Sequence, residues 1–236
     1  MSAETSVIPG WLQPLVTATR DVHVKDLTPF APPAGADVRP ASVLMLFGGD
    51  YSADDSREES RHVLLLERAH DMRSHAGQIA FPGGAHDLDD ADDVATALRE
   101  AQEETGLDPA GVEVIATLPK LWLPPSGFEV TPVLAWWRAP SPVRAVDPAE
   151  TASVHTVALG ELLDPVNRVT MRHPSGYRGP AFVIGDLVVW GFTAGLLSRL
   201  FAFVGWEQPW DVSRVVDLPP ELLALTSDSR REQVEP

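Results

Sequence analysis

Three glutamates are clustered in the segment 99–107, which reads Arg-Glu-Ala-Gln-Glu-Glu-Thr-Gly-Leu. A helix advances about 100° per residue, so Glu100, Glu103 and Glu104 would share one sector of its surface. Like charges at these spacings repel one another by roughly 0.2–0.5 kcal/mol per pair. A divalent cation relieves that repulsion, because Mg²⁺ takes oxygen ligands and is typically held by one or two carboxylates together with substrate phosphates. The pattern predicts metal-assisted attack on a diphosphate; the alternative is a solvated acidic face on a surface helix.

The helix that would carry these glutamates is expected over residues 92–105. Its apolar positions recur at i, i+3, i+4 and i+7 and comprise Val94, Ala97, Leu98 and Ala101. Such a stripe requires packing against a core. Glu104 lies at the edge of the stripe, Glu100 a little further round and Glu103 furthest away, so Glu100 and Glu104 are expected near the protein body. Arg99 precedes Glu103 by four residues and is expected to orient the cluster through a charge-assisted hydrogen bond.

A glycine pair, Gly83 and Gly84, precedes this helix and closely follows an apolar stretch at residues 79–81. Glycines let the backbone adopt positive φ or approach a ligand closely. We therefore expect a strand at residues 79–81 and a tight loop that leads from it towards the acidic helix.

The acidic segment resembles the Nudix box of the Nudix hydrolases. That pattern runs Gly, five residues, Glu, seven residues, Arg-Glu, an aliphatic residue, any residue, Glu-Glu, any residue, Gly and an aliphatic residue. The residues that match it are Gly84, Arg99, Glu100, Ala101, Glu103, Glu104, Gly106 and Leu107. Two features depart from the pattern. The spacing from Gly84 to Arg99 is one residue longer, and an acidic loop at residues 87–90 replaces the expected mid-box Glu, with Asp90 as its stand-in.

Upstream residues narrow the resemblance to the coenzyme A pyrophosphatase branch of the family. The matching residues are Leu64-Leu65-Leu66-Glu67-Arg68-Ala69, then Arg73, Gly77 and Phe81-Pro82-Gly83-Gly84. Leu66 stands where that signature usually has Thr, and the same branch commonly shows the lengthened box. Downstream, the segments 131–133, 147–150 and 189–195 are similar to the rest of that branch, so the resemblance covers about residues 40 to 205.

The resemblance implies a fold, a metal and a reaction. The fold is an α/β class, Nudix-type α/β/α sandwich with a mixed β-sheet. Mg²⁺ or Mn²⁺ would be held by Glu100, Glu103 and Glu104, with the Gly83 carbonyl as a further ligand. A water would attack phosphorus in line, and coenzyme A would yield 4′-phosphopantetheine and adenosine 3′,5′-bisphosphate. Glu103 and Glu150 are the candidates for the general base.

Substrate contacts are expected from the few basic residues that precede the glycine pair. Arg68 or Arg73 would grip the 3′-phosphate or the diphosphate, because a guanidinium binds phosphate with a bidentate fork. The alternative for both arginines is surface pairing with Glu67 and Asp71. His75 is a further candidate contact, although a lone loop histidine is usually structural. Gly84 completes the predicted substrate site.

Composition limits the remaining functions. The chain has 18 basic and 34 acidic residues and a net charge of −16, which argues against nucleic acid as a partner. It has no cysteine, so a thiol nucleophile is excluded. The N-terminus lacks a secretory signal pattern, and we expect a cytoplasmic protein. Two other functions stay open: a Nudix hydrolase for another nucleoside diphosphate, such as ADP-ribose, NADH or a nucleoside triphosphate, and a non-catalytic nucleotide-binding module.

The chain is expected to consist of an N-terminal extension (1–40), a hydrolase domain (41–205) and a C-terminal tail (206–236) in which residues 222–225 can dock. The apolar run 187–204 is near membrane-spanning length, but it contains Arg199 and lacks flanking basic residues. We therefore expect a long core helix there rather than a membrane span. That helix is also a candidate homodimer interface. Further strands are predicted at 41–47, 62–68, 112–118, 130–137, 168–172 and 181–184, with a strand or short helix at 154–163.

Overall fold

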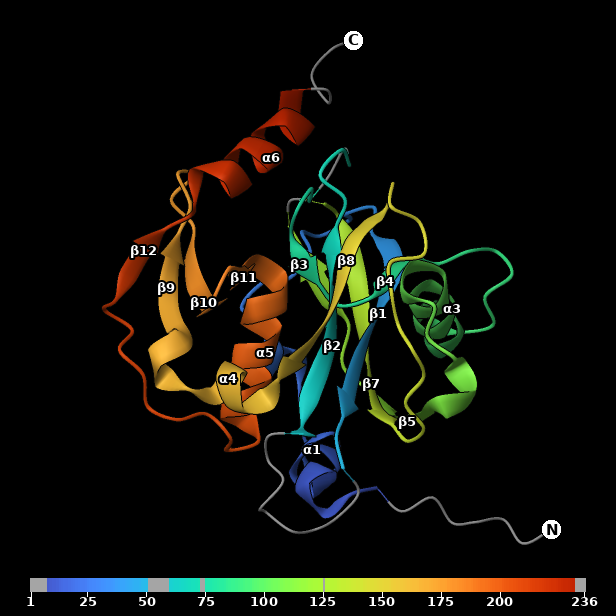
Figure 1. Cartoon of the computed structure of the whole chain (residues 1–236). Helices are drawn as coiled ribbons and strands as arrows, with labels where there is room; N and C mark the ends of the chain where they lie inside the picture. The colour runs from blue at the N-terminus through green and yellow to red at the C-terminus, as the bar shows by residue number, and fades with distance from the viewer. Residues whose placement is uncertain (1–7, 51–59, 73–74, 125, 232–236) are drawn as a thin grey trace, which may run out of the picture.

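A mixed β-sheet forms the centre of the computed structural model, which describes residues 8–50, 60–72, 75–124 and 126–231 (Figure 1). Its strands are β1 (Arg39–Gly48), β2 (His62–Arg68), β3 (Ile79–Ala80), β4 (Gly83–Ala85), β5 (Val112–Thr117), β6 (Leu121–Leu123), β7 (Phe128–Trp137) and β8 (Thr151–Ala158). The order β3-β2-β1-β7-β5 runs across the sheet, with β4 beside β1, β6 beside β7 and β8 beside β2. β1 and β7 are parallel and the other pairs are antiparallel.

Alternation along β1 divides the core between the two faces of this sheet. Leu44 and Leu46 pack on one face with Ala97 and Ala101 of helix α3 (Asp93–Thr105). The expected apolar stripe of that helix is therefore confirmed. The Asp92 side chain caps α3 by accepting a hydrogen bond from the Ala95 amide at 2.8 Å. The helix ends at Gly106, which has a left-handed φ of 69°. Local signals thus fix both ends of the helix that carries the glutamates.

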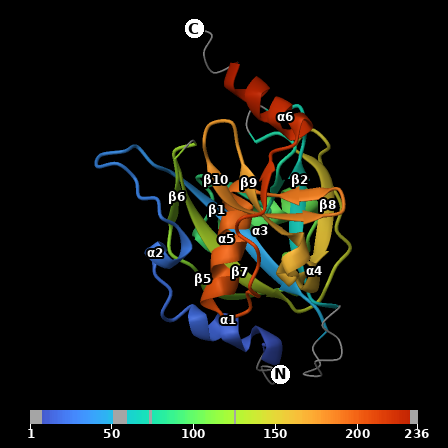
Figure 2. The ribbon, with the colours of Figure 1, turned by 90° about the vertical axis from the view of Figure 1, so that its left-hand side faces the viewer.

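The other face of the sheet is covered by helix α5 (Gly191–Phe203). The N-terminal helix α1 (Gln13–Ala18), which follows the short 3-10 turn η1 (Gly10–Leu12), lies at one end of the sheet (Figure 1). Met45 and Phe47 pack on this face, in one cluster with Leu197 and Phe201 of α5. Figure 2 shows α5 in front of the main sheet. With α3 on one face and α5 on the other, the predicted α/β/α sandwich with a mixed sheet is confirmed.

The prediction of one helix over the apolar run 187–204 is wrong. Residues Leu187–Val189 form strand β11, which pairs with β10 (Arg178–Ile184), and the helix begins at Gly191. Two β-branched valines favour an extended backbone there, and Gly191 adopts a φ of 65° that separates strand from helix. Along the part of the chain that the structure describes, no helix is both long and apolar enough to cross a membrane.

A second sheet, in the order β11-β10-β9-β12, lies beside α5. β9 (Arg168–Arg172) pairs antiparallel with β10 and parallel with β12 (Val215–Asp217). Short helices α2 (Val24–Leu27), α4 (Leu159–Leu163) and α6 (Pro220–Arg231) and the 3-10 turns η3 (Pro109–Gly111) and η4 (Pro165–Asn167) complete the described elements. Leu222 and Leu223 of α6 pack against the core of this sheet, so the expected docking of the C-terminal leucines is confirmed. The domain boundaries at residues 40 and 205 stay a prediction.

Candidate active site

The three glutamates of α3 differ in exposure in the order that helical geometry predicts. The side chain of Glu104 is 6% exposed, that of Glu100 is 18% exposed and that of Glu103 is 57% exposed. Glu104 and Glu100 therefore lie between the helix and the sheet, whereas Glu103 faces largely outwards.

Glu104 is a buried carboxylate with few partners. The Gly83 amide donates a hydrogen bond to its Oε2 atom at 2.9 Å, and Arg68 Nη1 lies 4.0 Å from its Oε1 atom. Burial is the main reason that the pKa of Glu104 is raised to about 7; the Gly83 and Arg68 contacts oppose this rise, and the nearby carboxylates of Glu100 and Glu150 add to it. Burial also raises the pKa of Glu100. The site therefore concentrates negative charge that its own cations do not fully balance.

The glycine pair allows the backbone of β4 to lie directly against these carboxylates. A Cβ atom at residue 84 would lie only 2.5 Å from the Glu100 carboxyl group. Gly83 has a φ of 155°, and a Cβ there would overlap the Ser42 carbonyl of the neighbouring strand. A larger residue at either position would displace a carboxylate or separate β4 from β1, so both positions require glycine.

Arg99 connects the carboxylates into one network. Its Nη1 atom donates to Glu103 at 2.9 Å, as expected, and also to Glu100 at 3.0 Å. Its Nε and Nη2 atoms bind both oxygens of Asp90 at 3.0 and 2.9 Å. These bonds hold the pKa of Asp90 well below its usual range. The two-pronged Asp90 contact was not predicted, although the acidic loop was noticed, because the loop's course cannot be derived from residue spacing.

Arg68 is the last residue of β2, and His75 lies on the loop that leads from β2 to β3. The Arg68 side chain is 22% exposed and reaches towards Glu104, so the alternative of surface pairing with Glu67 is wrong. Its Nε atom is buried and has no hydrogen-bond partner among the described residues. His75 has a left-handed φ of 58°, and its Nδ1 atom lies 3.1 Å from Gln78 Oε1. Burial lowers the pKa of His75. Arg73 lies outside the described residues.

Glu150 reaches the same site from the start of β8. Its carbonyl accepts a hydrogen bond from the Ala69 amide at 2.9 Å, which joins the start of β8 to the end of β2. Its carboxylate raises the pKa values of both Glu100 and Glu104. The charge of Glu150, an exposed residue, therefore acts on the carboxylates of α3, although 46 positions separate it from Glu104 in the sequence.

The chemistry of these donors fits a hard divalent cation. Glu100 and Glu104 offer carboxylate oxygens as ligands. Burial and repulsion between neighbouring carboxylates raise the pKa values of both groups, and a bound cation would stabilise their ionised forms. Within the described ranges, no three acidic or histidine side chains converge into a complete ligand cage. An ion here would take further ligands from water and from substrate phosphates, as Mg²⁺ does in many phosphoryl-transfer sites.

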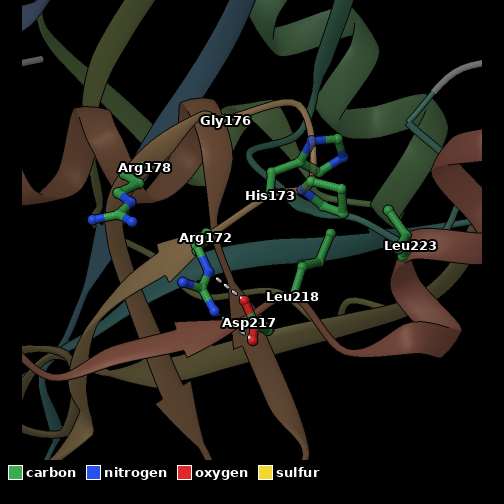
Figure 3. A pocket seen from close by; sticks show the side chains of 8 residues that line it. Arg172, His173, Gly176, Arg178, Asp217, Leu218 and Leu223 are labelled. Atoms are coloured by element: carbon green, nitrogen blue, oxygen red, sulfur yellow. Dashed lines mark hydrogen bonds and ion pairs between the residues drawn. The ribbon is translucent and has the colours of Figure 1, made fainter.

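A pocket of about 380 Å³ lies elsewhere, on the second sheet beside α6 (Figure 3). Its lining includes Arg172, His173, Asp217, Leu218 and Leu223, and it contains none of the predicted site residues. Arg172 binds Asp217 through two hydrogen bonds, as the dashed lines in Figure 3 mark. The predicted chemistry therefore belongs to the α3 side of the main sheet and not to this pocket.

Comparisons with known proteins identify the family of this chain. The family model of the NUDIX domain matches residues 54–175. An uncharacterized Nudix hydrolase, NudL of Cronobacter sakazakii, is 40% identical over 154 residues, which cover 62% of this chain and 77% of that protein. NudL of Citrobacter koseri is 40% identical over 150 residues, with 61% and 75% covered. The crystal structure of a Nudix hydrolase from M. smegmatis, RenU, has a TM-score of 0.50 at 20% identity and covers 73% of this chain and 89% of its own.

The chain belongs to the Nudix family. The family match, together with the buried glutamates of α3, defines a hydrolase that acts on phosphoanhydrides. The structural likeness to RenU shows the fold alone, and the relatives' names leave the substrate open.

Proposed function

We propose that this enzyme hydrolyses the diphosphate of coenzyme A or acyl-coenzyme A to 4′-phosphopantetheine, free or acylated, and adenosine 3′,5′-bisphosphate. One observation carries the proposal. Arg68 belongs to the upstream signature typical of coenzyme A pyrophosphatases, Glu104 belongs to the Nudix box, and their side chains lie 4.0 Å apart. These two residues, which are 36 positions apart in the sequence, thus lie near each other on one side of the main sheet.

The proposed metal ligands are Glu100 and Glu104, with the Gly83 carbonyl and, on the outer side, Glu103. Nudix enzymes typically use a divalent metal, and Mg²⁺ or Mn²⁺ bound here would neutralise diphosphate oxygens and lower the pKa of a water. Arg99 holds Glu100 and Glu103 in place through hydrogen bonds of 3.0 and 2.9 Å. The chain's own contribution to metal binding is therefore to keep two desolvated carboxylates close together.

Arg68 is the proposed phosphate-binding residue. Its Nε atom is buried without a described partner, and its Nη1 atom is 4.0 Å from Glu104, too far for a hydrogen bond. A guanidinium in this state retains N–H donors for an oxyanion such as a phosphate. Arg73 and His75 are proposed as further contacts on the same loop, and Gly84 as the backbone that lies under the diphosphate.

Glu150 is the proposed general base. It lies close enough to Glu100 and Glu104 to raise their pKa values. Glu103, the other candidate, already accepts a hydrogen bond from Arg99 Nη1 at 2.9 Å, which occupies one of its carboxylate oxygens. Glu150 would take a proton from the attacking water, and the bond that breaks lies between phosphorus and the bridging oxygen.

Product analysis by mass spectrometry tests the proposed substrate. Purified protein is incubated with Mg²⁺ and, in parallel, coenzyme A, ADP-ribose, NADH and a nucleoside triphosphate, with Glu104→Gln as the inactive control. Adenosine 3′,5′-bisphosphate that forms fastest, and only with metal, would support the proposal. Faster cleavage of another substrate would overturn the coenzyme A assignment and leave a different Nudix hydrolase. Tight nucleotide binding without any cleavage would favour a non-catalytic module.

A further inference from the structure

A hydrogen-bonded network lies on the face of β2 opposite to Arg68. Side chains alternate along a strand, so Glu67 faces away from the carboxylates of α3. Its Oε1 atom lies 2.8 Å from His70 Nε2, and its Oε2 atom accepts a hydrogen bond from Ser153 Oγ at 2.8 Å. Ser153 Oγ also lies 2.7 Å from His155 Nε2. The network therefore joins β2, the loop after it and β8.

The donors and acceptors of this network fit only one arrangement when Glu67 is ionised. A carboxylate accepts hydrogen bonds and donates none. His70 and Ser153 must then donate to Glu67, and His155 must donate to Ser153, whose single proton is already used. Burial alone would raise the pKa of Glu67, but the bonds from His70 and Ser153 reverse this effect and lower its pKa. Each of the three contacts thus has a donor and an acceptor, and together they connect the four side chains.

The network lies next to an irregularity in the pairing of β2 with β8. Glu67 pairs with Ser153, but the next residue, Arg68, pairs with Thr151, so Ala152 is an extra residue on β8. Such a bulge bends its strand and re-aims the adjacent side chains. Arg68 leaves β2 at this point, and Glu150 immediately precedes the bulged segment of β8. The bulge therefore sets the directions of both residues relative to α3.

We propose that Glu67 is a positioning residue. Through His70 and the Ser153–His155 pair it clamps the bulge between β2 and β8, and the clamped bulge holds Arg68 and Glu150 against the carboxylates of α3. Glu67 touches neither the substrate nor the metal in this role. The inference rests on the proposed function of Arg68 and Glu150, but it does not depend on which diphosphate the enzyme cleaves.

Ser153 offers the most conservative test, because its removal breaks the network without removing a charge. Ser153→Ala should lower kcat/KM about 10-fold or more, since small displacements of positioned groups are costly in catalysis. Ser153→Thr restores a hydroxyl and should recover most of the activity. Thr156→Ala, an exposed position on the same strand, is the matched control and should behave like wild type. Activity is measured on the diphosphate that the wild type cleaves best.

A double-mutant cycle separates positioning from general stabilisation. The loss of kcat that Ser153→Ala causes in the wild type should shrink to less than about 2-fold in a Glu150→Gln background, because the proposed base that Ser153 helps to place has already been removed; the rise in KM from the displaced Arg68 should remain. An equal loss of kcat in both backgrounds would overturn the proposal and assign the network to stability alone. Wild-type activity of Ser153→Ala would overturn it as well. Neither result would affect the substrate assignment, which the product analysis of the wild type decides separately.

Discussion

Two arginine–aspartate pairs in this molecule share a geometry but differ in their surroundings. Arg99 binds Asp90 through Nε and Nη2 at 3.0 and 2.9 Å, and Arg172 binds Asp217 through the same atoms at 2.6 and 2.9 Å. The first pair lies beside α3, where the Asp90 side chain is 6% exposed. The second lies on the second sheet, where the Asp217 side chain is 68% exposed. Bidentate geometry alone therefore does not distinguish a functional pair from a surface pair.

The difference lies in what else each pair holds. Arg99 also binds Glu100, Glu103 and the Ala85 carbonyl. Asp90 also accepts hydrogen bonds from the Thr96 hydroxyl and the Asp87 amide. Surface ion pairs contribute little to stability because water and salt screen them, whereas a sheltered network fixes several side chains at once. If this contrast is correct, the effects of mutations at these two pairs should depend on burial and on the number of partners rather than on charge.

The largest expected effect is at Glu150. Glu150→Gln keeps the size of the side chain but cannot accept a proton, so kcat should fall by about 10²–10⁴-fold. KM and the Mg²⁺ concentration for half-maximal activity should change little, because the side chain binds neither in the proposed mechanism. Steady-state kinetics at saturating Mg²⁺ provide the measurement. A loss smaller than that of Glu103→Gln would transfer the role of base to Glu103.

Glu104→Gln should have opposite effects on activity and stability. Activity should fall at least about 100-fold, since even outer-shell partners of a metal site are worth 10- to 100-fold. The pKa of Glu104 is raised from 4.5 to about 7, so its contribution to stability is fully present below pH 4.5 and is lost as the pH rises through 7. Glutamine cannot ionise and avoids this loss. Metal-free Glu104→Gln should therefore be more stable than wild type at pH 8 by up to about 3 kcal/mol.

Chemical unfolding in EDTA at pH 5 and pH 8 measures the second effect. The difference between the two proteins should be small at pH 5 and large at pH 8. Added Mg²⁺ should stabilise the wild type and not the variant, because binding to the folded state alone adds to the free energy of unfolding. A variant that is less stable than wild type at both pH values would contradict the inference that the ionised form of Glu104 destabilises the metal-free protein.

Asp90→Asn tests the sheltered pair directly. Without the Asp90 charge, the Arg99 guanidinium can form a second hydrogen bond to Glu100, in addition to the one at 3.0 Å, and compete with a cation for that carboxylate. The Mg²⁺ concentration for half-maximal activity should rise about 10- to 100-fold, the usual range for partners behind a metal ligand, while kcat at saturating metal is largely kept. Asp89→Asn, an exposed neighbour in the same loop, is the control. An unchanged Mg²⁺ dependence would show that Arg99 is held without Asp90.

Much of helix α3 and the exposure of its glutamates could be predicted from the sequence, because both depend on local periodicity. The spacing of Val94, Ala97 and Ala101 predicted which face of α3 is buried. The same geometry ranked Glu104, Glu100 and Glu103 correctly by exposure. The helix boundaries also agree within a residue, since Asp92 and Gly106 are strong capping residues.

Features that depend on tertiary contacts could not be predicted. The hydrogen bond between Glu67 and Ser153 joins residues 86 positions apart, and no local pattern indicates it. The three-residue strands β4 and β6 are too short to show an alternation of apolar and polar residues. The apolar run 187–204 was wrongly predicted as one helix, because hydrophobicity alone does not distinguish a buried strand followed by a helix from a longer helix.

Glu103→Gln tests whether the loss of activity on mutation depends on a residue's place in the proposed site or on the exposure of its side chain. Glu103 lies in the proposed site, but its side chain is 57% exposed and its described partner is Arg99. We expect kcat/KM to fall about 10-fold or less, below the effect at the sheltered glutamates. Steady-state kinetics beside Glu104→Gln make the comparison. An equal loss in the two variants would mean that Glu103 moves inwards when metal and substrate bind.

Asp217→Asn should have the smallest effect of all. Arg172 lies opposite Arg178 across β9 and β10, so removal of Asp217 leaves two neighbouring arginines with one anion fewer. Both partners of the ion pair are well hydrated, however, and salt screens the repulsion between the arginines. The melting temperature should therefore change by no more than about 1–2 °C, and less in 0.5 M salt, with wild-type kcat/KM. A loss of activity as large as that of Asp90→Asn would mean that exposure does not separate the two pairs, and that the pocket beside α6 contributes to the reaction.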